Sequence, residues 1–493
     1  MINEHEKILS KIGKTARFRF AGIIVQNLFF LITALLISRV LGAGSLGDFM
    51  LLIAVFQILG YASTLGMKYG ALRYVAYYNA RFDTPRVKGT ILSSMVVSLV
   101  VGGVLGIGLY VFTPWLGGRI FHAPALNDSF RILAFTLPVL ALSMVIIASL
   151  QGLKAIKQKV WLENYIQPLL ALCLIGLALG AGLRLTSIIG AWAISIVTIC
   201  VLSLIYLGRI CRDFWQRDRV HFEIKSLLSY SFPLLAVGFI YFLFTRMDIL
   251  MLGYFKTSSD VGIYAIAARM AILIELPINA LNAIFEPTIA EISARGEEKS
   301  LLRLYRTLTP WVVIIGFFIF MFLIVLAEPI MEIFGRSFLG GTMVLLILGI
   351  GQLVNIGVGS AGALLNMTGH PRVVLINTVS MICLNFVLNW VLIPVYGIYG
   401  AALATAISLG AINIVRLCEI KLILGISPFS PEYGKAISAA VITGGLILGG
   451  NFILSSYSAP VRSLLLLAVF CITYPLLLLG MGFPGRKKEL SEL

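Results

Sequence analysis

Apolar stretches of about 20 residues recur along the whole of this 493-residue chain, separated by short polar connections. A helix of that length crosses the roughly 30 Å hydrocarbon core of a membrane, where the backbone must satisfy its own hydrogen bonds. Only 12% of the residues are charged, against about 25% in soluble domains. These features predict an all-α integral membrane protein.

The limits of the apolar stretches predict about fourteen transmembrane helices. They lie near 18–42, 45–67, 88–113, 127–153, 158–182, 186–208, 226–254, 260–284, 304–327, 338–365, 372–395, 398–422, 433–455 and 460–482. Pro277 is expected to distort the eighth span. The short connections leave no room for a soluble catalytic domain.

The basic residues gather on one side of the predicted membrane. With both termini on that side, its connections hold 29 of the 38 Lys and Arg residues, Arg416 among them. Because cytoplasmic connections are enriched in Lys and Arg, both termini are predicted to be cytoplasmic in a plasma-membrane protein. Insertion and contact with anionic membrane lipids explain the net charge of +16, so we expect no nucleic-acid partner.

Three pairs of similar segments recur at shifts of 210 to 215 residues. They are GSLGDF (44–49) with SDVGIY (259–264), ASLQGLKAIK (148–157) with ALLNMTGHPR (363–372), and SIIGAWA (187–193) with GIYGAAL (397–403). The shift covers six spans, so both copies keep the same orientation. The repeat predicts two six-helix lobes, 1–215 and 216–425, related by a pseudo-twofold axis along the membrane normal. Residues 426–493 are then an appended helix pair with a cytoplasmic tail.

The sequence lacks the patterns of an enzyme centre. It has no P-loop, and its four histidines show no metal-ligand spacing. The cysteines form no CxxC pair and are interpreted as small core residues. They are Cys173, Cys200, Cys211, Cys383, Cys418 and Cys471. We therefore expect no metal, no cofactor and no enzymatic activity.

Arg246, Asp248 and Arg269 lie inside two consecutive predicted spans, where each charge costs a few kcal/mol. At 1.5 Å per residue, Arg246 and Arg269 lie roughly 12 to 14 Å from the outer ends of two consecutive helices. Asp248 is about 200° round the helix from Arg246, which is unfavourable for an ion pair between them. Asp248 is expected to pair with Arg269 or with another helix.

Two interpretations of these charges remain open. Asp248 and Arg269 tie the two spans together while Arg246 extends toward the interface, or at least one arginine lines a cavity and binds an anionic substrate. Guanidinium groups suit phosphate because they present a fork of donors. The repeat favours the cavity, since Arg246 and Arg269 correspond to Leu31 and Ala54 in the first copy.

Other polar groups in the spans are weaker candidates. Asn27, Gln57 and Tyr61 contact sugars or hydrogen-bond neighbouring helices. Glu275 and Asp248 are candidates for binding a coupling proton or cation.

Three longer stretches resemble one known family. They are LISRVLGAGSLGDFMLLIAVFQILGYASTLGMKYGALRYVA (36–76), TRMDILMLGYFKTSSDVGIYAIAARM (245–270) and GIYGAALATAISLGAINI (397–414). The chain is similar over essentially its whole length to the polysaccharide transporter, or Wzx-like flippase, family of the multidrug/oligosaccharidyl-lipid/polysaccharide exporter superfamily. The resemblance implies two lobes around a central cavity that opens alternately to each side.

The resemblance also implies a substrate, a lipid-linked oligosaccharide that is flipped outward for cell-surface glycan biosynthesis. Glycan-assembly proteins are then candidate partners. Family members bind pyrophosphate or acidic sugars with cationic cavity residues, and the matching positions are Arg246 and Arg269. The main alternative is a cation-coupled multidrug antiporter of the same superfamily, for which a negatively charged cavity is expected. An oligosaccharide polymerase or ligase is disfavoured by the lack of a long outward loop.

Overall fold

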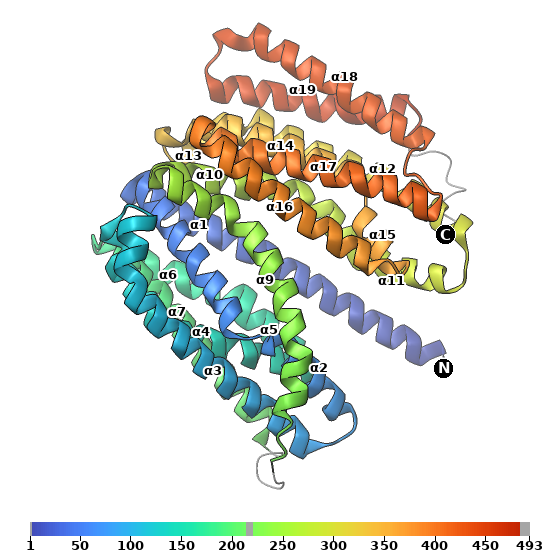
Figure 1. Ribbon diagram of the computed structural model, residues 1–493. Helices are drawn as coiled ribbons and strands as arrows, with labels where there is room; N and C mark the ends of the chain where they lie inside the picture. Colours follow the sequence, from blue (N-terminus) through green and yellow to red (C-terminus); the bar gives the residue numbers. More distant parts are fainter. Residues whose placement is uncertain (1, 213–219, 484–493) are drawn as a thin grey trace. The chain divides into compact units, whose positions relative to one another are not determined.

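The computed structural model describes residues 2–212 and 220–483, and all their regular structure is helical (Figure 1). The chain forms two compact units, Met1–Tyr254 and Phe255–Leu493. Part of the connection between the predicted lobes, 213–219, and the basic residues 486–488 lie outside the described residues.

The first unit consists of helices whose limits lie close to the predicted spans. They are α1 (Ile2–Ser63), α2 (Met67–Ala80), α3 (Thr84–Trp115), η1 (Leu116–Ile120), η2 (Pro124–Leu126), α4 (Asn127–Gly152), α5 (Ile156–Val160), η3 (Trp161–Ile166), α6 (Gln167–Gly180), α7 (Leu185–Ile210) and α9 (Ile224–Phe255). Trp192 of α7 packs edge-on against Phe56 of α1, with ring centroids 5.4 Å apart.

Helix α1 is interrupted where two separate spans were predicted. Gly42 has φ 84° and ψ 175°, a backbone conformation that side chains with a Cβ rarely adopt. The ribbon of α1 turns back on itself in Figure 1. The apolar part, Phe18–Ser63, has 46 residues, and a straight helix of that length would extend about 69 Å. That length is enough for two crossings.

The connection predicted at 68–88 contains a further helix, α2, which the sequence interpretation missed. Gly66 precedes α2 with φ 74°, in the left-handed region. A Cβ at Gly66 would lie 2.0 Å from the backbone oxygen of Ser231 in α9. Glycine at this position therefore lets α2 begin at an angle to α1 and lets α9 approach the backbone closely.

Helix α9 packs with the first unit, although residue 215 was the predicted end of the first lobe. Tyr61 of α1 stacks on Phe242 of α9, and a Cβ at Gly253 would lie 2.4 Å from a methyl group of Leu51. Contacts between helices therefore place the boundary between the two units at the end of α9, whereas the predicted lobes follow the internal repeat. The lobe limits and the pseudo-twofold axis remain predictions.

The second unit contains the remaining helices, again close to the predicted spans. They are α10 (Ser258–Ala271), η4 (Ile272–Glu275), α11 (Leu276–Ala294), α12 (Glu298–Val325), α13 (Ala327–Phe334), η5 (Arg336–Phe338), α14 (Gly341–Gly357), α15 (Ala361–Met367), α16 (Pro371–Tyr396), α17 (Ile398–Leu424), α18 (Pro431–Ile453), η6 (Leu454–Ser456) and α19 (Ala459–Gly480). Thr257 and Asp260 form a capping box that starts α10. The predicted distortion near Pro277 is present, since η4 separates α10 from α11.

The C-terminal helices α18 and α19 lie side by side and pack against α12 (Figure 1). The Tyr474 hydroxyl donates a hydrogen bond to the backbone oxygen of Ile314 at 3.3 Å. Arg462 of α19 forms an ion pair with Glu328 of α13 at 2.8 Å. The two C-terminal helices are thus bonded to α12 and α13 of the same unit.

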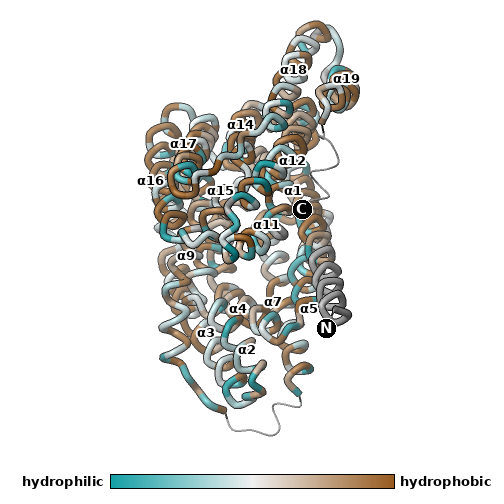
Figure 2. The backbone as a smooth tube through the Cα atoms, turned by 90° about the vertical axis from the view of Figure 1, so that its right-hand side faces the viewer, coloured by the Kyte–Doolittle hydropathy of each residue, from teal (hydrophilic) through white to brown (hydrophobic). Residues whose placement is uncertain are grey.

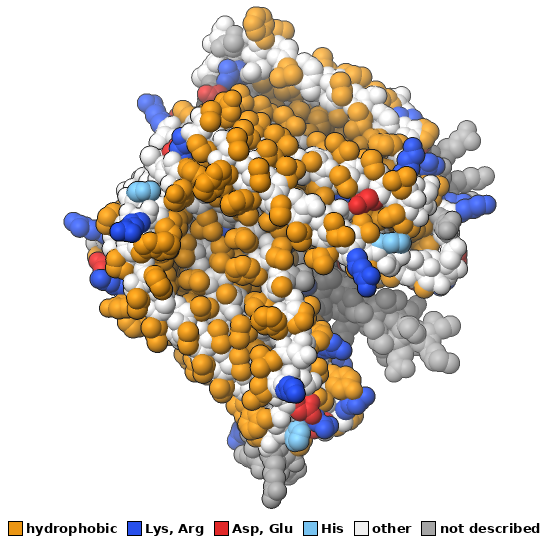
Figure 3. Space-filling view, viewed as in Figure 1, with side chains coloured by type: hydrophobic (Ala, Val, Ile, Leu, Met, Phe, Trp, Pro, Cys, Tyr) orange, Lys and Arg blue, Asp and Glu red, His pale blue; other side chains and the backbone are white. Residues whose placement is uncertain are grey.

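Twelve helices in the described ranges are long and apolar enough to cross a membrane, or thirteen if the bent α9 is one span. Hydrophobic residues follow the long helices, and hydrophilic ones gather mainly at their ends (Figure 2). Hydrophobic side chains also cover most of the face in Figure 3. The protein is therefore a multi-pass membrane protein, and the count of fourteen remains a prediction.

The cysteines only partly fit their interpretation as core residues. All six are free thiols, but only Cys200 and Cys211 are buried. The other four lie exposed on helices, where an apolar thiol is compatible with lipid.

Candidate functional site

Arg246 lies in α9, nine residues before Phe255. Its side chain is half-buried, and no hydrogen-bond partner of its Nε occurs among the described residues. The guanidinium carbon lies 5.9 Å from the centroid of the Phe242 ring, one turn earlier. An aromatic face attracts a cation but leaves the guanidinium donors available.

The Phe242 ring belongs to a row in which two stacked aromatic rings lie between two cations. Phe242 stacks on Tyr61 of α1, with centroids 4.3 Å apart and planes inclined by 29°. The ammonium group of Lys68, in α2, lies 5.0 Å from the Tyr61 centroid and 3.5 Å from its hydroxyl oxygen. We call Lys68, Tyr61, Phe242 and Arg246 the cation–ring column. Three helices of the first unit contribute to it.

Gln57 lies one turn before Tyr61 on α1. Its Oε1 is buried, and within 2–212 and 220–483 nothing donates a hydrogen bond to it. Asn27 donates instead to the backbone oxygen of Ile23, at 2.8 Å, within its own helix. The structure therefore places Gln57 next to the column, whereas this hydrogen bond of Asn27 is local.

The other predicted charges occupy different elements. Asp248 is half-buried in α9, two residues after Arg246. Arg269 lies in the last turn of α10, in the second unit, and is also half-buried. Their roles in binding remain proposals.

Glu275 ends η4 and lies in a network of amide side chains in the second unit. Its Oε1 accepts a hydrogen bond from Asn355 at 3.4 Å, and Gln352 and Asn279 also bond with its carboxyl group. Asn355 accepts in turn from Asn413 of α17 at 3.0 Å.

Arg416 extends this network and was missed from the sequence, where it was counted with a connection. It lies within α17, eight residues before Leu424, and donates to Asn413 Oδ1 at 3.4 Å. Its Nε is buried, and no partner for it occurs in the described part of the chain. The signal was present, because the predicted span 398–422 contains Arg416.

The two groups of residues differ in chemistry. The cation–ring column offers positive charge beside flat apolar faces, an arrangement suited to an anion that carries carbon rings. The network around Glu275 joins a carboxylate to a guanidinium through amides, which suits the exchange of a proton or a cation. No group of three or more His, Cys, Asp or Glu residues that could bind a metal occurs among the described residues.

The model of one protein family, described as polysaccharide biosynthesis protein, matches residues 13–293, more than half of the chain. The chain belongs to this family. Its match includes every residue of the cation–ring column. The MatE family model matches residues 233–391.

Two curated relatives come from Haloferax volcanii. The "Probable low-salt glycan biosynthesis flippase Agl15" is 27% identical over 229 residues, which cover 46% of this chain and 48% of the relative. The "Probable flippase AglR" is 28% identical over 256 residues, which cover 50% and 52%. The chain spans about half the length of the curated relatives it matches.

Solved structures support the same fold. The lipid II flippase MurJ, in an inward closed conformation, matches with a TM-score of 0.70 at 14% identity, over 94% of this chain and 99% of that chain. An inward-facing multidrug transporter of the MATE family matches with a TM-score of 0.68 at 16% identity, over 83% and 98%. This chain therefore has the fold shared by flippases and multidrug transporters of the superfamily.

Proposed function

We propose that the protein is a flippase that moves a lipid-linked oligosaccharide across the plasma membrane by alternating access, with both termini in the cytoplasm. The cation–ring column carries this proposal, because it offers cations and aromatic faces to a substrate that combines phosphate with sugar rings. Membership of the polysaccharide biosynthesis family and similarity to relatives named as flippases support it. Glycan-assembly proteins are the partners that such an activity requires.

In this proposal Arg246 binds the phosphate of the lipid carrier. A guanidinium group donates two parallel hydrogen bonds to phosphate, and the Nε of Arg246 has no competing partner in the described structure. Tyr61 and Phe242 add apolar ring surface between the two cations, and Gln57 offers an unused amide oxygen to a hydroxyl group. We propose that Arg269 adds positive charge for the same substrate, with Asp248 and Asn27 as further candidate contacts.

The test is transport by purified protein in liposomes with a fluorescent lipid-linked oligosaccharide. We expect Arg246→Gln to lower the initial flipping rate at least about tenfold, because a charge-assisted pair of hydrogen bonds is lost. Arg246→Lys keeps the positive charge but loses the two parallel donors of the guanidinium group, so we expect an intermediate flipping rate. Arg303→Gln is the matched control in α12, with no change expected. Wild-type rates in folded Arg246→Gln protein would contradict this role of Arg246.

A cation-coupled antiporter is the second candidate, and the buried network around Glu275 is the observation that favours it. We propose that Glu275 exchanges a proton or cation in either case. A flippase moves labelled lipid-linked oligosaccharide with or without a gradient of drug-like cations. An antiporter instead accumulates such cations when a proton or sodium gradient is imposed, so the two assays separate the candidates.

A further inference from the structure

The chain just before α9 lies directly on the backbone of α3. The His221 amide donates a hydrogen bond to the backbone oxygen of Pro85 at 3.1 Å. A Cβ on Gly89 would lie only 1.7 Å from the backbone oxygen of His221. Glycine at position 89 therefore leaves the space that this segment occupies.

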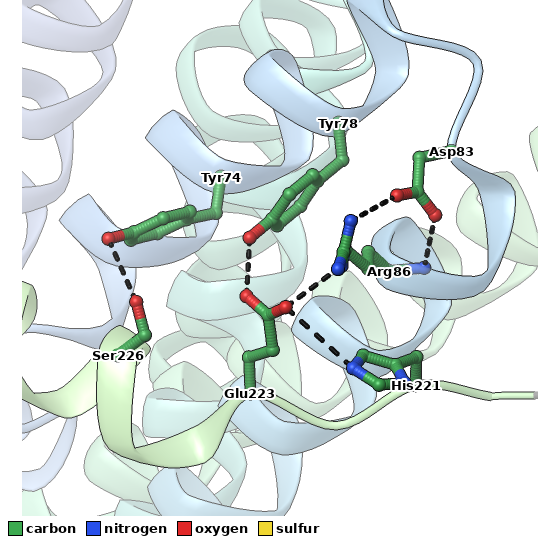
Figure 4. Close-up of polar contacts among 7 residues, drawn as sticks. All are labelled: Tyr74, Tyr78, Asp83, Arg86, His221, Glu223 and Ser226. Atoms are coloured by element: carbon green, nitrogen blue, oxygen red, sulfur yellow. Dashed lines mark hydrogen bonds and ion pairs between the residues drawn. The ribbon is translucent and has the colours of Figure 1, made fainter.

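One carboxylate, Glu223, joins the segment to two helices (Figure 4). Its Oε2 accepts a hydrogen bond from the Tyr78 hydroxyl of α2 at 2.5 Å. Its Oε1 lies 2.8 Å from Nε of Arg86 in α3 and 3.7 Å from Nε2 of His221. Arg86 is also paired with Asp83, the N-cap residue of α3, at 2.9 Å. We call Tyr78, Arg86, His221 and Glu223 the Glu223 clasp.

The protonation states of the clasp fit this geometry. Burial, followed by the hydrogen bond to Glu223, raises the pKa of Tyr78 to about 12. The hydrogen bond from Tyr78 is the main cause that lowers the pKa of Glu223. At neutral pH the tyrosine is therefore a protonated donor and the glutamate an ionised acceptor.

The first two turns of α9 add a second row of contacts with α2. Tyr74 and Ser226 share a hydrogen bond between their hydroxyl groups at 3.3 Å. The Arg73 guanidinium lies 4.1 Å from the ring centroid of Tyr230. One turn before Tyr74 on α2, a Cβ on Gly70 would lie 2.1 Å from the Ser231 hydroxyl oxygen. Glycine thus lets this part of α9 lie close to α2, where the side chain of Leu227 is buried with Met67 and Ala71.

We infer that the Glu223 clasp is a releasable fastening, which keeps the segment from His221 to Ile240 on α2 and α3 and opens without unfolding the rest of the first unit. The polar contacts of Tyr78, Arg86 and His221 converge on one carboxylate, so these three are lost together when Glu223 is released. Arg86 and Glu223 are 43% and 30% exposed, and pairs that water reaches are weak and exchange readily. Helix α9 bends by 41° between Ile240 and Phe242, which gives the fastened part a hinge.

The first test measures hydrogen–deuterium exchange of the full-length protein in nanodiscs. We expect Glu223→Gln to speed exchange of the amides in 220–232 by about threefold to tenfold, because the charge-assisted bonds are weakened. Exchange in α4 and α7 is expected to stay at the wild-type rate. Asp128→Asn is the control, since it removes a carboxylate from an exposed ion pair with Arg131 that lies outside the clasp.

Two outcomes would overturn the inference. Unchanged exchange in 220–232 would show that Glu223 does not fasten the segment. Faster exchange throughout the first unit would show that the cluster supports the whole unit instead of a separable segment. Neither outcome depends on the substrate, so the flippase proposal is judged separately.

A second variant removes the fastening without changing any charge. Gly89→Ala places a methyl group on the backbone of His221, and we expect it to speed exchange in 220–232 as Glu223→Gln does. Gly103→Ala makes the same change in the same helix, where no atom lies within 4 Å of the added Cβ. Equal exchange in the two alanine variants would contradict the inference.

Discussion

At the residue scale, the surroundings of Arg246 in the cation–ring column come from distant parts of the chain. Counting along the span predicts that Arg246 lies deep in the membrane. Its contact with Phe242 follows from helical spacing, but the stacking of Phe242 on Tyr61 joins residues far apart in sequence. No spacing rule predicts such a pair, because it depends on how α9 packs against α1. Lys68 was likewise interpreted only as a basic residue of a connection.

The column predicts different effects for two substitutions of Tyr61. Tyr61→Phe keeps the ring that stacks on Phe242 and loses only a long contact with Lys68, so we expect nearly unchanged stability and flipping. Tyr61→Leu loses the stacked pair, which contributes about 0.5–1.5 kcal/mol beyond burial. We expect it to lower the melting temperature in detergent and the flipping rate in liposomes. Equal behaviour of the two variants would show that the ring is not required.

At the element scale, the ends of the helices follow signals that are present in the sequence, whereas their breaks depend on packing. The Thr257–Asp260 capping box starts α10 as its local pattern indicates. The helix α2 was missed because its tyrosines, Lys68 and Arg73 resemble a polar connection. The buried face of α2 packs against α3, α4 and α9, and these contacts cannot be seen in the sequence. Arg416 lies inside the predicted span 398–422 but was counted with the basic residues of the next connection, so its contact with Asn413 was missed.

The break in α1 predicts a contrast between two neighbouring glycines. At Gly42 the positive φ makes alanine strained, and we expect Gly42→Ala to reduce stability by about 1–2 kcal/mol. No atom lies within 4 Å of a Cβ at Gly42 or Gly44, so crowding plays no part. Gly44 has no positive φ, and we expect Gly44→Ala to be neutral or slightly stabilising. Thermal unfolding of both variants in one detergent measures the difference, and equal melting temperatures would exclude a strained break.

At the scale of the whole molecule, the apolar stretches were the most reliable sequence signal. The requirement for internal backbone hydrogen bonding leaves few alternatives to helices in lipid, so the described helices start and end close to the predicted limits. The division into units was harder to predict. The repeat assigns α9 to the second copy, whereas contacts with Tyr61, Gly66 and Leu51 place it in the first unit. The internal repeat reflects how the two halves of the sequence are related, whereas the contacts show which helices pack together.

The charge distribution predicts the orientation of the chain in the membrane. With the native cysteines replaced, we expect Arg184→Cys to react with a membrane-impermeant maleimide in intact cells. Lys157→Cys is expected to react only after the cells are permeabilised, because its connection belongs to the cytoplasmic set. Both side chains are exposed, so burial does not explain a difference. The reverse pattern would place both termini outside the cytoplasm.

The close approach at Gly66, Gly70 and Gly89 has a consequence for variation and engineering. Gly66 and Gly89 face backbone atoms, so the constraint there falls on the glycine alone, whereas Gly70 faces the side chains of Ser231 and Leu227. Phe222, which is exposed beside His221, is free to be exchanged or to carry a spectroscopic label. In a library randomised at positions 89 and 222 and selected for folded protein, we therefore expect almost only glycine at 89 and many different residues at 222.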